Sequence, residues 1–500
     1  MHHSSTLPWT DLAVLLAYVG GIFALGCWFA RRSNNTEEFM AAGRSLPGWV
    51  VGLSLFGTYT SSISFLGNPG SSYAGNWNAF ALSLSLPIAA VAAAWWFIPY
   101  YRRSGNVSAY SRLEERFGPW ARLYATTFYL LTQIARLGTI TFLVSTAVAP
   151  LTGWDIREII VVVGVLVTVY TLLGGIEAVI WTDVAQAFVL TAGIVASICV
   201  LLLGMPEGPG QVFTIAAEHD KFSLGSFGTS LSEKTFWVVF IYGLCINLQN
   251  FGIDQSYVQR YFTAKSDRDA ARSGLIGALL CLPVAAMLFF LGTSLFAYYT
   301  ARPELLAGKS GDDVFPHFIV SGLPAGMTGL LIAAVLAAGM SSLDTSLNSS
   351  ATLLLQDIYK RYLRPLAGER ESMLVLRGTT VVWGAIGTCA ALALVGTEGM
   401  LDAWFKLSGL FSGGMLGLFL LGLISRRAGN PAAATGVLTA VSLMMWMSLS
   451  KFDWWPARLS EFRSPLHDYL AIVLGTLSIL FVGLLVASLA PRPRGDSSSA

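Results

Sequence analysis

Hydroxyl side chains are dense in one apolar stretch of the chain, in the run 337–350. Ser341, Ser342 and Thr345 stand at positions i, i+1 and i+4, which share one face of a helix. Neutral oxygens suit a monovalent cation such as Na⁺ better than Ca²⁺, which prefers several carboxylates. The alternative is that these hydroxyls join neighbouring helices, as hydroxyls often do in membrane bundles.

Two carboxylates fall at apolar positions. Asp344 lies inside the hydroxyl-rich run, and Asp183 lies at the start of another apolar stretch, 183–204. Carboxylates are costly in a membrane and indicate a function with a cation as partner. Each of the two acids is therefore a candidate ligand of a cation. For Asp183, a cap at the start of a helix is an equally good interpretation.

Arg136 lies deep in the apolar stretch 122–151 and needs an anion. A guanidinium matches a carboxylate through two parallel hydrogen bonds, so a substrate carboxylate is one candidate partner. An internal Asp or Glu is the other. Lys406 has Asp402 one helical turn before it, which favours a structural pair.

The elements that must position these residues are membrane-spanning helices. Apolar residues make up 54% of the 500 residues and charged residues only 12%, with a mean hydropathy of +0.62, which excludes an ordinary soluble domain. About thirteen stretches approach the length that crosses the hydrocarbon core. A net charge of +2 gives no reason to expect nucleic acid as a partner. The expected surroundings are a lipid bilayer.

The basic residues predict how the chain is oriented. Most of the 31 Lys and Arg residues fall in loops on one side, if the apolar stretches all cross the membrane. Because basic loops favour the cytoplasmic side, we expect an N-terminus outside and a C-terminus inside the cell membrane.

Two of the stretches contain residues that interrupt a helix. The first, 55–64, has a glycine followed by hydroxyls, and the second, 247–255, is rich in Asn and Gln. They lie five spans apart. Paired interruptions are typical of transporters with inverted repeats, in which unwound backbone at the midplane binds ions and substrate. A single interruption would be explained as well by helix packing.

Several motifs, taken in order, resemble the sodium:solute symporter family. They are Glu38–Arg44, Gly174-Gly175 through Trp181-Thr182-Asp183 with Gln186, Asp254-Gln255 with Val258–Tyr261, Ser341-Ser342, and Asp357–Tyr359. The resemblance implies an all-α membrane protein with the 5+5 inverted repeat of the leucine transporter, one extra N-terminal helix and two extra C-terminal helices. The implied division is an N-terminal helix and cytoplasmic loop (1–47), a first repeat (48–204), an extracytoplasmic loop (205–234), a second repeat (235–425), and two C-terminal helices with a polar tail (426–500).

The resemblance also implies binding sites. One sodium ion would be held by the carbonyls of Gly57, Thr60 and Ala338 and the hydroxyls of Ser341 and Ser342. In some members a second sodium is held at positions that match Asp183, Asp344 and Thr345. Thr345 fits that pattern, whereas Asp344 puts a charge in place of a hydroxyl, so it could strengthen the site or take a proton.

The substrate positions resemble those of the bacterial sialic acid symporters in part. Arg136 falls where those proteins hold the substrate carboxylate, and Ser61 and Ser64 match hydroxyl-bearing positions. Tyr59, Ala79 and Ser83 depart from the pattern and would reshape the pocket.

The resemblance therefore implies a monomeric sodium-coupled symporter that imports a small organic solute by alternating access, with Na⁺ as the coupling ion. An acidic sugar such as sialic acid, or another carboxylate, is the expected solute. A symporter of neutral sugars and a transporter-like membrane sensor are the alternatives. An enzyme is not expected, because the histidines lie in the tail and in loops placed outside: His2, His3, His219, His317 and His467.

Overall fold

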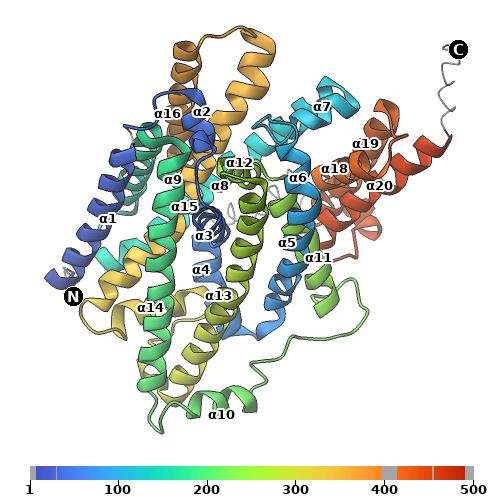
Figure 1. The fold of residues 1–500 in the computed structure, drawn as a ribbon. Coiled ribbons are helices and arrows are strands. Elements are labelled where there is room, and N and C mark those ends of the chain that lie inside the picture. Colours follow the sequence, from blue (N-terminus) through green and yellow to red (C-terminus); the bar gives the residue numbers. More distant parts are fainter. Residues whose placement is uncertain (1–6, 30, 397–413, 453–454, 490–500) are drawn as a thin grey trace, which may run out of the picture.

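The computed structural model describes residues 7–29, 31–396, 414–452 and 455–489, which form a bundle of helices (Figure 1). Over these residues the only β-type contact is an isolated bridge between Leu46 and Ala264. The long helices are α1 (Trp9–Phe29), α8 (Pro119–Thr152), α9 (Ile156–Leu203), α11 (Phe236–Ile253), α13 (Asp267–Ala301), α15 (Met327–Leu353), α16 (Glu369–Leu394), α19 (Asn430–Leu449) and α20 (Leu470–Leu489). The shorter ones are α2 (Thr36–Ala41), α3 (Gly48–Tyr59), α4 (Ser62–Ala74), α5 (Leu86–Ala92), α6 (Ile98–Arg102), α7 (Ser111–Phe117), α10 (Gln211–Glu218), α12 (Gln255–Thr263), α14 (Val314–Ser321) and α18 (Met415–Ile424).

The helices agree with the predicted spans. Ten of those in the described ranges are long and apolar enough to cross a membrane, and the bent pair α3 and α4 makes an eleventh. Helix α9 has 48 residues, a length of about 72 Å that exceeds one crossing of roughly 30 Å. Its backbone leaves the helical region at Gly175 (φ 58°, ψ −156°), which divides it into the two spans predicted at 157–174 and 183–204. Helix α18 covers part of the span predicted at 403–425; Lys406 and Asp402 lie outside the described residues.

Both predicted interruptions are present. Helix α3 ends at Tyr59 and α4 begins at Ser62, with a bend of 58° between them. At the bend the Ser61 amide donates to the Tyr59 carbonyl (3.1 Å) instead of to Gly57, its partner in a continued helix. The second interruption separates α11 from α12 at Asp254, whose extended backbone starts a new helix that its own carboxylate caps. The division into two five-helix repeats stays a prediction.

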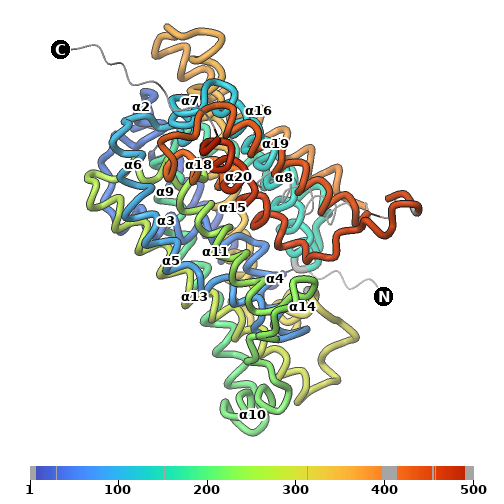
Figure 2. The backbone as a smooth tube through the Cα atoms, turned by 90° about the vertical axis from the view of Figure 1, so that its right-hand side faces the viewer, coloured from blue at the N-terminus to red at the C-terminus, as the bar shows by residue number. Residues whose placement is uncertain are grey.

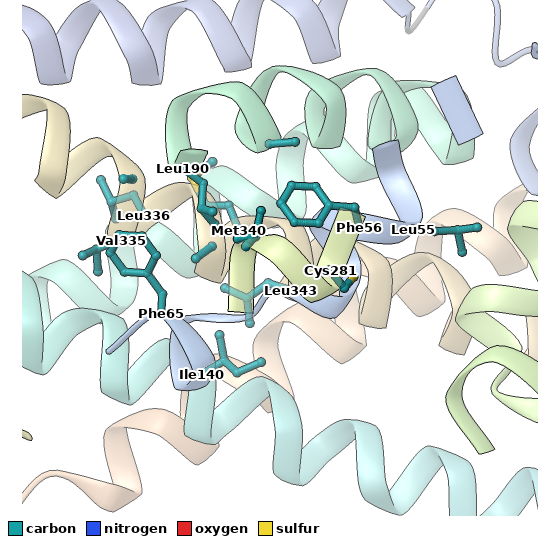
Figure 3. Close-up of a cluster of buried hydrophobic side chains, with 14 of the residues drawn as sticks. Leu55, Phe56, Phe65, Ile140, Leu190, Cys281, Val335, Leu336, Met340 and Leu343 are labelled. Carbon is teal, nitrogen blue, oxygen red and sulfur yellow. The ribbon is translucent and has the colours of Figure 1, made fainter. Parts of the chain in front are cut away.

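The broken helix packs against α15, which is the most enclosed element. Every residue of α15 from 331 to 353 is buried. Figure 3 shows Phe56 of α3 and Phe65 of α4 close to Leu336, Met340 and Leu343 of α15. The same helix buries its hydroxyl face, so the run of serines faces protein rather than lipid. This packing brings the unwound residues 60–61 beside the polar part of α15.

The two ends of the bundle are built differently. Helix α10 lies at one end, and α2 and α7 lie at the other (Figures 1 and 2). At the α7 end, Glu114 accepts hydrogen bonds from Arg122 (2.9 Å) and Arg361 (2.8 Å), and Arg122 also pairs with Asp357. Partial burial raises the pKa of Glu114, but the hydrogen bonds from Arg122 and Arg361 outweigh it and hold the pKa below its usual value. Ion pairs therefore close the bundle at this end.

Gly175 has a backbone conformation that other residues rarely adopt, and a Cβ there would lie 3.0 Å from the Phe39 backbone. We expect Gly175→Ala to destabilise the fold by about 1–3 kcal/mol and to lower the melting temperature in detergent by several degrees. The control is Gly20→Ala in α1, where a Cβ meets nothing within 4 Å. Equal melting temperatures for the two variants would contradict this account of the kink.

Candidate functional site

A cavity of about 560 Å³ lies where the broken helix meets α8, α11 and α13. All six residues predicted to bind substrate line it: Tyr59, Ser61, Ser64, Ala79, Ser83 and Arg136. They come from four segments, which are the end of α3, the start of α4, the 3₁₀ segment Trp77–Ser85 and the middle of α8. The structure thus brings these residues together; their role in binding stays a prediction.

The wall of the cavity is polar where helix α3 breaks. Ser61 Oγ and Ser64 Oγ lie 3.3 Å apart on the first turn of α4. Tyr59 donates its hydroxyl to Asn247 Oδ1 (3.0 Å), and the Asn247 amide donates to Ser85 Oγ (3.0 Å). These bonds hold the Tyr59 ring at the edge of the cavity, while Ser61 and Ser64 remain able to meet a ligand.

Arg136 is partly buried at the cavity wall, and its guanidinium donates a long hydrogen bond from Nη2 to the Thr58 carbonyl (3.4 Å). Within the described part of the chain, no carboxylate lies at ion-pair distance from its guanidinium. Asp254, a nearby acid, accepts instead from the Ser256 amide (2.8 Å). The internal acid that was the alternative partner of Arg136 is therefore present nearby as Asp254, close enough for its charge to interact with Arg136, but it forms no direct ion pair with the guanidinium.

The residues predicted for the first sodium lie on two elements in contact. A Cβ on Gly57 would lie 3.3 Å from Ser341 Oγ and 3.4 Å from the Asp183 carbonyl, so only glycine leaves this space open. At the break the Gly57 carbonyl loses its helical hydrogen bond, because the Ser61 amide donates to Tyr59 instead. Thr60 lies one residue before Ser61, whose carbonyl accepts the first hydrogen bond of α4, from the Phe65 amide. Ser342 Oγ lies 3.4 Å from the Ala338 carbonyl. These neutral oxygens fit Na⁺.

Asp183 is fully buried and paired with Arg260 of α12, with 2.8 Å between Oδ2 and Nη2. Ser54 and Ser341 each donate a hydroxyl to the Asp183 carboxylate at 2.5 Å. Asp183 lies more than two turns beyond the kink at Gly175, inside α9, so it does not cap a helix start.

Arg260 also donates to Thr345 Oγ1 (2.6 Å), so the guanidinium contacts two of the three residues predicted for a second sodium. Asp344, the third, accepts a hydrogen bond from the Tyr170 hydroxyl (2.7 Å) and lies 3.4 Å from Thr345 Oγ1. Asp183, Asp344 and Thr345 are therefore connected through a single polar network. Arg260 belongs to the motif Val258–Tyr261, but the spacing of that motif did not identify Asp183 as its partner.

Asn250 and Lys234 are among the residues of the cavity that sequence reasoning missed. Asn250 belongs to the polar run 247–255, whose composition was the available signal. Lys234 also lines the cavity, although it had been assigned only to an outer loop. With Arg136 it makes two basic residues in the lining, and no acidic residue of the described chain lines the cavity.

Comparison with known proteins supports the resemblance. A model of the sodium:solute symporter family matches residues 39–440. The sodium/sialic acid symporter NanT of Aliivibrio fischeri is 34% identical over 478 residues, which cover 95% of this chain and 92% of that protein. The sodium/sialic acid symporter SiaT of Proteus mirabilis is 33% identical over 484 residues, or 96% and 95% of the two chains.

Solved structures agree with this assignment. The substrate-bound, outward-open structure of a Na⁺-coupled sialic acid symporter matches with a TM-score of 0.88 and 31% identity, over 97% of this chain and 98% of that one. Mhp1, a nucleobase-cation-symport-1 family transporter, matches with a TM-score of 0.59 at 18% identity over 92% of this chain and 96% of its own, which shows a shared fold. The predicted all-α, leucine-transporter-like fold class is confirmed.

These findings make the chain a multi-pass membrane transporter of a small molecule rather than an enzyme, with Na⁺ as its coupling ion. As its motifs predict, the chain belongs to the sodium:solute symporter family.

Proposed function

We propose that this symporter imports a small solute that carries a carboxylate, most simply an acidic sugar of the sialic acid type. The observation that supports this proposal best is Arg136, which lines the cavity without an acidic partner among the described residues. A guanidinium that is partly removed from water is stabilised when an anion pairs with it. A carboxylate provides that anion with matching geometry, and the two bacterial relatives are named for an acidic sugar.

The shape of the molecule supports an alternating-access cycle. The cavity extends toward the α10 end, where exposed Lys234 lines it, whereas the α7 end is closed by the Arg122–Asp357 and Arg122–Glu114 pairs. With the predicted orientation, N-terminus outside and C-terminus cytoplasmic, the cavity faces outward and its contents leave through the α7 end. One chain supplies all the predicted binding residues, which supports a monomer as the working unit.

Sodium coupling at Gly57, Thr60, Ala338, Ser341 and Ser342 predicts a loss of sodium affinity when hydroxyls are removed. We expect Ser341→Ala and Ser342→Ala to raise the sodium concentration for half-maximal uptake into liposomes about tenfold each, because each removes one of five oxygens. The control is Ser350→Ala, a buried hydroxyl two turns further along α15. Uptake that is unchanged when choline replaces sodium would overturn the site.

A second cation near Asp183, Asp344 and Thr345 is supported by charge balance. The two carboxylates and the Arg260 guanidinium are fully buried in one network, so two negative charges face one positive charge when both acids are ionised. An uncompensated buried charge is costly. One more positive charge, either a sodium ion or a proton, makes the network neutral.

We therefore expect more than one positive charge to enter with each solute molecule, and more than one sodium ion where sodium rather than a proton neutralises the network. The ratio is measured by parallel uptake of radioactive sodium and solute in liposomes. Asp344→Asn keeps the shape and removes one charge, so it should reduce the ratio to one. Ser350→Ala is again the control. A ratio of one that Asp344→Asn does not alter would assign Asp344 to a structural or proton-binding role.

The carboxylate contact at Arg136 is tested by binding. We expect Arg136→Ala to weaken binding of an acidic solute by roughly a hundredfold, since a charge-assisted bidentate pair contributes about 2–3 kcal/mol. Arg136→Lys should also weaken binding, because Lys keeps the charge but not the planar fork. Arg32→Lys, an exposed arginine paired with Glu177 at 3.3 Å, is the control.

Thermal shift in sodium gives the readout, with N-acetylneuraminate, glucuronate, pyruvate and glucose as probes. Stabilisation by an acid that both Arg136 variants lose supports the assignment. Stabilisation by glucose and by no carboxylate would identify a neutral-sugar symporter. A protein that binds solute but transports none into liposomes, whether or not these contain sodium, would be a sensor rather than a transporter.

A further inference from the structure

Lys234 stands at the boundary between the main cavity and a smaller chamber. It lines the cavity that holds Arg136 and also an adjoining space of about 260 Å³. The smaller chamber is lined by amides, hydroxyls and backbone of Ser71, Asn76, Asn78 and Gly225. Lys234 is exposed to solvent and lines both spaces, so it lies where the main cavity, the smaller chamber and solvent meet.

The loop that carries Lys234 is fixed in place. Lys221 donates to the carbonyls of Tyr73 (2.7 Å) and Gly75 (2.9 Å) at the end of α4, and Asn78 donates to the Leu224 carbonyl (2.9 Å). The Lys234 ammonium lies 5.8 Å from the ring centre of Tyr469, another residue of the cavity wall. Because the loop is held at several points, the Lys234 ammonium stays over the mouth of the main cavity, and the loop does not have to become ordered when solute binds.

The positive charge of Lys234 contacts the Tyr469 ring but is neutralised by no carboxylate of the described structure. Within it, no carboxylate pairs with the ammonium: Asp468 pairs with Lys451 (2.6 Å), and Glu233 is exposed and lines neither space. The nearby imidazole of His467 has its pKa lowered mainly by burial; Asp468 opposes this shift, and the charges of Lys451 and Lys234 add to it. Arg136, in the same cavity, likewise forms no ion pair with an acid of the described residues. The two cations thus follow one another along one path.

We propose that Lys234 is an outer anion-binding residue, which receives the carboxylate of the incoming solute before Arg136 binds it. This inference rests on the proposed function and adds to it a sequence of two binding steps, first at Lys234 and then at Arg136. The residue types suit the two steps. An ammonium on a flexible stem is a hydrated point charge that attracts an anion without fixing it, whereas a guanidinium fork fixes it. Positive charge at the mouth of a cleft also raises the rate of anion entry, and dissolved salt reduces that effect.

The test compares uptake of N-acetylneuraminate and glucuronate at low and high ionic strength, with sodium held constant and choline chloride added. We expect Lys234→Gln to raise KM roughly three- to tenfold at low ionic strength, to leave the maximal rate unchanged, and to approach the wild type at high ionic strength. Lys234→Arg should behave as the wild type. Lys309→Gln is the matched control, because Lys309 is exposed in the loop that follows α13 but lines neither space.

Each outcome decides between the proposals. A wild-type protein that takes up neither acid overturns the proposed solute class and this inference with it. Wild-type uptake of an acid with the same KM and salt dependence in Lys234→Gln overturns the outer site alone. A rise in KM that Lys234→Arg shares, or that persists at high ionic strength, would show that Lys234 acts through the shape of the loop, and also overturns it.

Discussion

The buried pair between Asp183 and Arg260 is the interaction on which the centre of this symporter depends. Two charges removed from water are stable only when each is paired and its remaining hydrogen bonds are made. Here the partners come from four helices: Asp183 from α9, Arg260 from α12, Ser54 from α3, and Ser341 and Thr345 from α15. The relative positions of these helices are therefore restricted by one polar network.

That network also determines where the binding residues lie. Gly57 sits against both Asp183 and Ser341, so the end of α3 is fixed where its helix is interrupted. From that point the chain turns into α4, whose first serines face the cavity. Residues of the proposed sodium site, Gly57 and Thr60, thus alternate along the break with residues of the proposed solute site, Tyr59 and Ser61. Such proximity provides a direct physical route for coupling, because an ion bound by the carbonyls stabilises the conformation that presents the serines.

Much of this arrangement could be predicted from the sequence. Membrane spans follow from composition, and the two interruptions follow from glycine and polar residues in segments that lipid would otherwise make apolar. Arg136 was identified because a deep arginine needs an anion, and it does line the cavity. The partner of Asp183 could not be predicted, since 77 residues separate it from Arg260 and the chemistry of a carboxylate is the same for a cap, a cation and an arginine. Lys234 was missed because a loop lysine has no periodic pattern; only the folded path of 205–234 places it over the cavity.

The ion pairs at the α7 end bear on which conformation the empty carrier occupies. Asp357 is almost fully enclosed and also accepts from Ser108 (2.9 Å) and Thr126 (2.7 Å), so separating it from Arg122 exposes several groups at once. Arg361, by contrast, is exposed and its bond to Glu114 contributes little. Opening this end therefore requires mainly that the interactions of the Asp357 carboxylate be broken. In the proposed cycle, a preference of a few kcal/mol for the paired arrangement would leave only about one molecule in a hundred open at this end, and the other molecules would be available to solute arriving from the α10 side.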